Sequence, residues 1–199
     1  MLKSRLCIAF FAFAVGCAPA QKPLTDYVNP MLGTATLWDS VDLGFKPTKR
    51  TWGAEVFPGS SLPNAMVQVS PVTKFHSGAG YQYEDSVIYG FTHTNKGHWN
   101  LCHIPLLPVT GTPTPGDYCS PFSHERESAA PGYYQVFLDR YGVDAQLSST
   151  LRCAFHKYTY PAGAAASLLA DLQRSNEHVR AWDIRKEGDN VFAGWQQTG

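Results

Sequence analysis

A segment near the middle of the chain is dense in side chains that could do chemistry. Between residues 90 and 103 it carries three histidines, two asparagines, a lysine, a tryptophan and a cysteine: His93, Asn95, Lys96, His98, Trp99, Asn100, Cys102 and His103. Imidazole and amide groups donate and accept hydrogen bonds, and an indole can stack on a flat apolar surface. This set suits a polar ligand with an apolar face, such as a sugar. We therefore take His93, His98, Trp99, Asn100 and His103 as candidate ligand-binding residues.

The same sequence shows no complete catalytic or metal-binding pattern. The spacing of the histidines and Cys102 matches no common zinc motif. Two acidic pairs occur, Glu84 with Asp85 and Glu125 with Glu127. Neighbours on a strand point to opposite faces and residues two apart share one face, whereas the two carboxylates of an inverting glycosidase lie about 6.5 to 9.5 Å apart across the substrate. We therefore predict that both acidic pairs lie on the surface.

A second candidate segment covers residues 35 to 52, which show no regular hydrophobic period. It contains Trp38, Arg50 and Trp52. Long irregular segments more often form functional surfaces than spacers. Arg50 is either a ligand contact at the rim of a pocket or a surface cation.

Composition limits the class of protein. The chain has 199 residues, 44% hydrophobic and 13% aromatic, which is enough for one folded domain with a core. Its formal net charge is zero, so there is no basic stripe of the kind that marks nucleic-acid binders. We expect no nucleic-acid partner.

Short β-strands separated by turns account for most of the chain. The predicted strands cover residues 65–71, 87–93, 104–110, 133–138, 143–150, 152–160, 164–172, 179–184 and 191–195. Residues 164–172 have helical propensity through alanine and leucine, but all their neighbours are strands, so we predict a buried strand. The pattern is typical of an antiparallel β-sandwich in an all-β fold. The last strand is barely complete at Gly199, and we expect a fragment whose last strands are missing.

The first 20 residues have the features of an export signal. Lys3 and Arg5 precede an apolar stretch at 6–15 that is too short to span a bilayer. Two processing sites fit: cleavage after Ala20, or acylation of Cys17 in a lipoprotein signal. Either one predicts an exported bacterial protein, in the periplasm or anchored by lipid to the outer membrane. Among Cys102, Cys119 and Cys153, two could form a disulfide, or all three could be buried as small apolar residues.

Several motifs in collinear order carry a resemblance to a known family. They lie at residues 26–34, 57–59, 66–71, 80–83, 88–94, 131–136, 155–161 and 168–172. Together, over about residues 26 to 199, the chain resembles the N-terminal domain of glycoside hydrolase family 92, whose members are exo-acting α-mannosidases. It departs from the family at residues 96–103, which replace a Gly/Ser-rich stretch and an Asp-Tyr-Gly. The mannosidic linkage and the aglycone therefore stay open.

The resemblance implies two domains, of which the second carries the catalytic residues. The N-terminal sandwich occupies residues 21–199 here, and a following (α/α)₆ barrel, absent from this sequence, carries a general acid Glu, a general base Asp and Ca²⁺. The sandwich would lend loops to a pocket for mannose-containing glycans and would not hydrolyse them alone. Two alternatives are a stand-alone carbohydrate-binding module and a purely structural sandwich.

Overall fold

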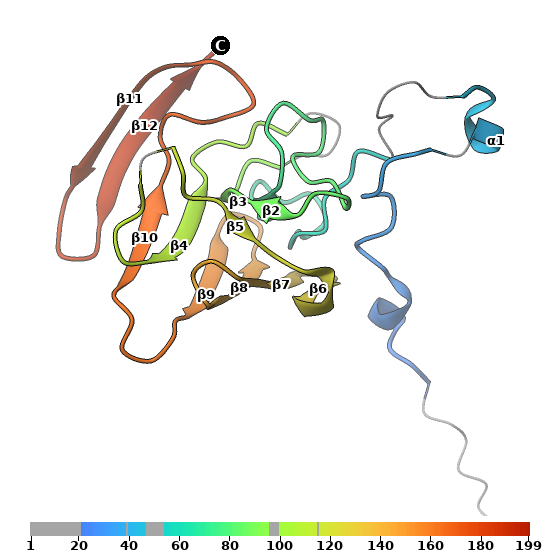
Figure 1. The fold of residues 1–199 in the computed structure, drawn as a ribbon, viewed down its shortest axis with the longest axis horizontal. Helices are drawn as coiled ribbons and strands as arrows, with labels where there is room; N and C mark the ends of the chain where they lie inside the picture. The colour runs from blue at the N-terminus through green and yellow to red at the C-terminus, as the bar shows by residue number, and fades with distance from the viewer. Residues whose placement is uncertain (1–20, 39, 47–53, 96–99, 115) are drawn as a thin grey trace, which may run out of the picture.

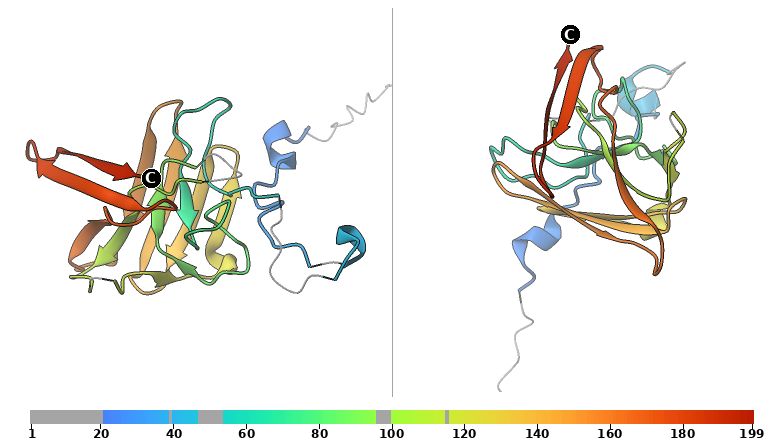
Figure 2. Two further views of the ribbon diagram at one scale, coloured as in Figure 1. Left: turned by 90° about the horizontal axis from the view of Figure 1, so that it is seen from above. Right: turned by 90° about the vertical axis from the view of Figure 1, so that its left-hand side faces the viewer.

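The computed structural model describes residues 21–38, 40–46, 54–95, 100–114 and 116–199. Two four-stranded antiparallel sheets form its body (Figures 1 and 2). The first has the order β1-β3-β4-β10, with β1 at Ser70–Val72, β3 at Gly90–Thr92, β4 at Leu106–Thr110 and β10 at Ala166–Ala170. The second has the order β6-β7-β8-β9, with β6 at Glu127–Ala130, β7 at Tyr133–Leu138, β8 at Val143–Ser149 and β9 at Ala154–Thr159. The predicted antiparallel β-sandwich is confirmed.

The second sheet follows from simple alternation of residue types. Along β7 and β8 every second residue is buried, and the inward side chains are Tyr134, Val136, Leu138, Val143, Ala145, Leu147 and Ser149. The turn between the two strands places Gly142 at a φ of 65°, which glycine adopts without strain. Fully burying one large aliphatic side chain contributes about 1.5–3 kcal/mol, so this face anchors the core.

The first sheet supplies the other half of the core through Phe91, Leu107 and Val109, which are essentially inaccessible, as is Val69 just before β1. The predicted strand at 87–93 is divided. β2 at Val87–Ile88 pairs with β5 at Ser120–Pro121, and β3 begins only after Tyr89. The division lets β3 join the main sheet, where it ends at the histidine-rich loop.

β10 confirms the strand predicted within residues 164–172 but corrects its burial. Leu168 is 53% exposed, and only Leu169 packs against the core. β10 is an edge strand paired to β4 alone, and within the described chain nothing covers its outer face. The apolar composition of residues 164–172 therefore did not predict their burial.

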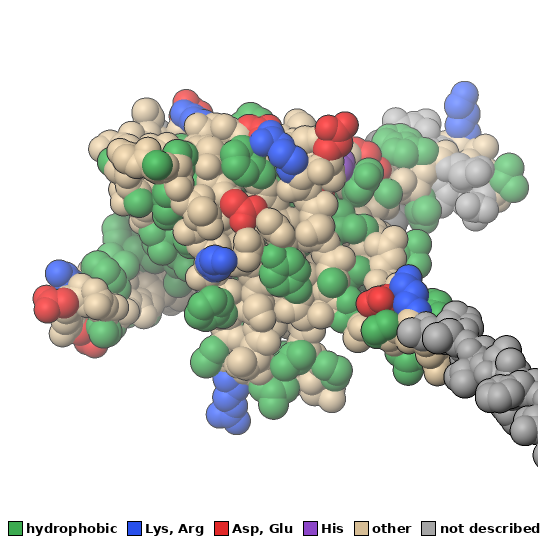
Figure 3. Space-filling view, turned by 90° about the horizontal axis from the view of Figure 1, so that it is seen from below, with side chains coloured by type: hydrophobic (Ala, Val, Ile, Leu, Met, Phe, Trp, Pro, Cys, Tyr) green, Lys and Arg blue, Asp and Glu red, His purple; other side chains and the backbone are tan. Residues whose placement is uncertain are grey.

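The last two strands form a separate hairpin that projects from the sandwich (Figures 1 and 2). β11 at Val179–Lys186 pairs only with β12 at Phe192–Thr198. Trp182 and Trp195 on this hairpin are 42% and 49% exposed, and Phe192 is 65% exposed. Hydrophobic side chains reach the surface on the projecting end at the left of Figure 3. An isolated two-stranded hairpin is at best marginally stable in water, so this element is incompletely packed.

The N-terminal part leads away from the sandwich (Figure 1). It contains the 3₁₀ turn η1 at Leu24–Tyr27 and the short helix α1 at Ser40–Leu43, and a second 3₁₀ turn, η2 at His124–Arg126, precedes β6. Within the described residues no helix has the length and apolar character needed to cross a membrane. The predicted export signal and Cys17 lie outside the described residues.

Candidate functional site

The loop between β3 and β4 is fixed at its first end by Asn95. This side chain is almost fully buried at 3% exposure. Its Nδ2 donates to the carbonyls of Thr92 at 2.7 Å and Gln68 at 2.9 Å, and its Oδ1 accepts from the Thr92 hydroxyl at 3.1 Å. All polar atoms of the amide are satisfied, so Asn95 stabilises the loop rather than offering groups to a ligand.

The second end of the loop is fixed by Asn100. Its side chain has no exposed surface, its Nδ2 donates to the carbonyl of Ala79, and its backbone N–H donates to Gly78 at 2.8 Å. The N–H of His103 donates to the Thr94 hydroxyl at 3.0 Å, which joins the two ends. The contacts of Asn100 therefore support a structural role, and its predicted contact with a ligand gains no support from them.

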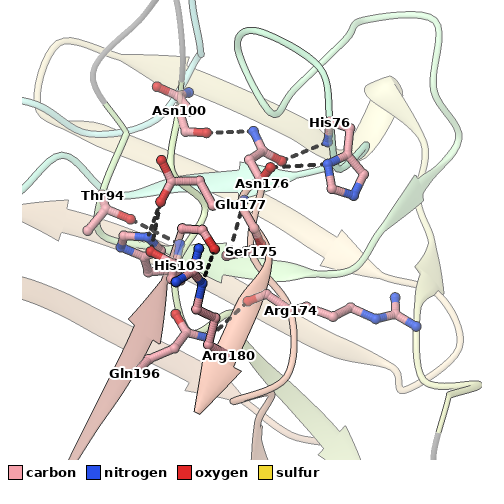
Figure 4. A network of polar contacts seen from close by, with 12 residues as sticks. His76, Thr94, Asn100, His103, Arg174, Ser175, Asn176, Glu177, Arg180 and Gln196 are labelled. Atoms are coloured by element: carbon pink, nitrogen blue, oxygen red, sulfur yellow. Dashed lines mark hydrogen bonds and ion pairs between the residues drawn. The ribbon is translucent and has the colours of Figure 1, made fainter. Parts of the chain in front are cut away.

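Asn176 connects this loop to two other segments (Figure 4). Its Oδ1 accepts from the N–H of His76 at 2.7 Å, and its Nδ2 donates to the carbonyls of Ser77 at 3.1 Å and Asn100 at 2.5 Å. Its own N–H donates to the Leu101 carbonyl at 2.9 Å. Sequence reasoning missed Asn176, because the partners of its side chain lie 76 to 100 residues away and leave no local pattern.

His93 turns toward the second sheet. Its Nε2 lies 2.8 Å from Nε2 of His156 on β9, and Nδ1 of His156 lies 2.7 Å from the Tyr158 hydroxyl. Of two nitrogens this close, one donates and the other accepts, so the pair can hold at most one positive charge. Burial lowers the pKa of both histidines, and burial followed by repulsion from His93 brings the pKa of His156 to about 4. His93 is thus part of a half-buried hydrogen-bonded contact between the two sheets.

His103 lies at the other end of the loop, beside the segment that precedes β11. Its Nε2 is 3.9 Å from Oε2 of Glu177, which in turn accepts from the Thr198 hydroxyl at 2.7 Å (Figure 4). Burial lowers the pKa of His103, and the charge of Glu177 opposes that change. Of the six candidate binding residues, the structure thus places His93, Asn100 and His103 around one loop. Arg50, His98 and Trp99 lie outside the described residues.

The predicted surface position of Glu127 is wrong. Its side chain is 1% exposed and accepts hydrogen bonds from the hydroxyls of Tyr81 at 2.9 Å and Tyr134 at 2.6 Å, with His124 Nδ1 at 2.5 Å. Burial, followed by the charge of Glu127, raises the pKa of both phenols. A carboxylate with this many contacts is a structural anchor. Its neighbour Glu125 is exposed as predicted.

The other acidic pair also has partners. Glu84 lies at the surface, where its carboxylate accepts from the backbone N–H of Thr36 at 2.6 Å and from the Thr36 hydroxyl at 3.0 Å. Asp85 is half-buried and accepts from the Thr73 hydroxyl at 2.9 Å. Both carboxylates therefore hold loops together.

The cysteines Cys102, Cys119 and Cys153 are free thiols, of which Cys102 is buried and Cys153 exposed. Burial raises the pKa of Cys102 to about 12, against a smaller opposing effect of its hydrogen bond with Thr92. The Cys102 thiol is therefore protonated and unreactive at neutral pH. Of the two interpretations offered for the cysteines, burial as a small apolar residue fits Cys102 alone.

The described residues contain no cluster of metal-binding side chains. Among them, no three side chains of histidine, cysteine, aspartate or glutamate gather closely enough to hold an ion. The family resemblance assigns the calcium ligands to the barrel domain that would follow, so the expected calcium ion stays a prediction.

Fold and site together define a β-sandwich domain in which distant loops meet in a buried polar network. Residues 27–199 match the glycosyl hydrolase family 92 N-terminal domain, and the chain belongs to this family. No curated protein matches the chain.

Solved structures give the same family. The α-mannosidase BT3965 of Bacteroides thetaiotaomicron, of family GH92, is similar with a TM-score of 0.74 and 30% identity, over 88% of this chain and 24% of that one. The same protein in complex with mannoimidazole has a TM-score of 0.74 and 29% identity, over 88% of this chain and 23% of that one. The inverting mannosidase BT2199 of Bacteroides thetaiotaomicron, also of family GH92, has a TM-score of 0.61 and 26% identity, over 76% and 20%. The chain thus spans about a quarter or less of the length of these relatives.

Proposed function

We propose that this chain is the pocket-forming N-terminal domain of an exported, calcium-dependent, inverting exo-α-mannosidase that acts on α-mannosides or N-glycans. The observation that carries the proposal is the loop between β3 and β4, whose two ends are hydrogen-bonded by Asn95, Asn100 and Asn176. Loop ends fixed in this way reduce the conformational entropy that is lost when the loop binds a sugar. Family membership and two similar structures described as mannosidases support the choice of sugar.

In this proposal the chemistry belongs to the rest of the protein. A general acid there would protonate the leaving oxygen while a general base activates water on the opposite face of the ring. Bound calcium would supply a hard cation for sugar hydroxyls. The described carboxylates Glu84, Asp85 and Glu127 hold tyrosine, threonine or histidine side chains, which supports the view that this chain alone is inactive.

A further domain of the same protein is the proposed partner of the exposed apolar surface. The side chains of Leu168, Trp182, Phe192 and Trp195 are between 42% and 65% exposed on β10 and the projecting hairpin. Exposed apolar surface of this kind often marks an interaction site. Export, with either free release or acylation of Cys17, completes the proposal and rests on the sequence of residues 1–20.

Trp99→Ala in the full-length enzyme tests the pocket-forming role. We expect kcat/KM on an α-mannoside to fall about tenfold or more, since stacking of an aromatic ring contributes about 0.5–1.5 kcal/mol beyond the area it buries. Tyr27→Ala, at an aromatic residue that is 69% exposed on the N-terminal segment, is the control and should change kcat/KM less than twofold. Equal activity of the Trp99 variant and wild type would show that the loop between β3 and β4 does not line the pocket.

A further inference from the structure

His76, in the loop after β1, has an unusual backbone conformation for a residue with a side chain. Its φ is +59°, a region that few residues other than glycine adopt. Cys102 and Ile104, at the second end of the loop between β3 and β4, also have positive φ values, of 51° and 46°. The value at Ile104 is a clear outlier, because its side chain is β-branched. Strained residues cluster at ligand-binding sites, where the surrounding structure holds them in place.

Hydrogen bonds through Asn176 and Asn100 join the two strained segments into one unit (Figure 4). The side chain of Asn176 accepts from the N–H of His76 at 2.7 Å and donates to the carbonyl of Asn100 at 2.5 Å. The N–H of Asn100 in turn donates to the carbonyl of Gly78 at 2.8 Å. Both asparagines are buried, at 4% and 0% exposure, so water does not compete for these bonds. The position of His76 is therefore fixed relative to the loop that we propose for the pocket.

The imidazole of His76 is held in one tautomer. Its Nδ1 lies 3.1 Å from the backbone carbonyl oxygen of Asn176. A carbonyl oxygen can only accept, so Nδ1 donates and carries the proton. In the neutral ring Nε2 then has a lone pair and no proton, and it can only accept a hydrogen bond. No residue in the described part of the chain donates to this nitrogen.

The accepting edge of the ring is available to a ligand. His76 is exposed, and with Phe75 it lines one side of an open cavity of about 490 Å³. This volume is within the range of small-ligand sites, roughly 300–1,000 Å³. Because Nδ1 is turned to the backbone of Asn176, Nε2 is the polar atom of the ring that a ligand in the cavity can use. The loop after β1 thus presents one acceptor whose position and protonation are both set before a ligand arrives.

We propose that His76 is a substrate-binding residue whose Nε2 accepts a hydrogen bond from a hydroxyl group of the glycan. An acceptor without a proton suits a hydroxyl and disfavours an ionised phosphate or carboxylate, which has no proton to donate. His76 forms a wall of the pocket next to the loop between β3 and β4, and Asn176 is the positioning residue that holds both. The inference rests on the proposed function, because it takes the ligand to be a mannose-containing glycan.

His76→Asn in the full-length enzyme separates this contact from the fold. Asparagine adopts positive φ more readily than most residues, and its side-chain N–H can replace Nδ1–H, but it has no atom in the place of Nε2. On the α-linked mannobiose that wild type hydrolyses fastest, we expect kcat/KM to fall about fivefold, the size of one neutral hydrogen bond, with an unchanged thermal midpoint. The control Lys74→Ala, at an exposed residue two positions earlier, should hydrolyse this substrate like wild type.

Three results would overturn the contact. The first is an unchanged kcat/KM in His76→Asn while Trp99→Ala loses activity, which would leave the proposed function standing. The second is a fall in thermal midpoint that accompanies the loss of activity, which would make the role of His76 structural. The third is a histidine ¹⁵N spectrum in which Nε2 of the neutral ring carries the proton. Failure of wild type to hydrolyse any α-linked mannobiose would instead overturn the proposed function, and this contact with it.

Discussion

Glu127 connects the start of β6 to the interior of the sandwich through hydrogen bonds from two buried tyrosines. Both phenolic hydroxyls and the ring of His124 converge on this carboxylate, which has almost no contact with solvent. A buried carboxyl group is tolerated only when such partners compensate for its lost hydration. The residue therefore matters to stability far more than its place in a short acidic cluster indicates.

Glu127→Ala should lower the free energy of unfolding by about 3 kcal/mol, because it leaves two buried phenols and an imidazole without their partner. Glu127→Gln keeps one accepting oxygen and should lose less. Glu125→Ala, two residues away and exposed, should change stability by no more than about 0.5 kcal/mol. Urea unfolding of the three variants measures the differences; similar losses at Glu125 and Glu127 would contradict the anchor role.

At the scale of elements, the contact of His93 with His156 joins β9 to the residue that follows β3. Both rings are neutral in the folded chain because burial lowers their pKa values. The unfolded chain has a histidine pKa near 6.5 and so binds more protons than the folded chain as the pH falls. The stability from this pair is thus fully present above about pH 6.5 and is lost as the pH decreases toward about 4.

The His156→Gln variant isolates this effect. We expect wild type to lose up to about 3 kcal/mol more stability than the variant between pH 7 and pH 4, which is the free-energy equivalent of the lowered pKa of His156. Denaturant unfolding at a series of pH values measures the difference between the two proteins. Parallel pH profiles would show that the pair is not neutral in the folded chain.

The hairpin of β11 and β12 should open more easily than the second sheet. Its two strands pair only with each other, whereas β7 and β8 are paired on both sides within a buried core. Hydrogen exchange should therefore be fast in β11 and slow in β7 and β8. Equal protection in the two regions would mean that the hairpin is packed on the sandwich.

At the scale of the whole molecule, the sequence predicts the sheets better than the polar interior. Period-two alternation at residues 133–160 is enough to place β7, β8 and β9, because an inward and an outward face leave a direct mark on residue type. The position of a strand at the edge of a sheet does not change its residue types in this way, so the exposure of Leu168 was not predicted. The burial of Glu127 depends on Tyr81, which is 46 residues away in the sequence. From the sequence alone, Glu125 and Glu127 among polar neighbours resemble a surface cluster.

The candidate loop shows the same limit at the functional site. Its composition predicts a polar loop, and its role in binding a ligand stays a prediction. It could not separate side chains that hold the loop, such as Asn95 and Asn100, from side chains free to meet a ligand, since that distinction depends on the partners brought by Gln68, Ala79 and Asn176.

The Asn176 side chain also has a consequence for the order of folding. It joins segments separated by 76 and 99 residues, and contacts that close such long loops form only after the chain has already been brought together. Replacing Asn176 by Ala should therefore speed unfolding and leave the folding rate nearly unchanged. The polar network would then set the lifetime of the folded state without helping the chain to reach it.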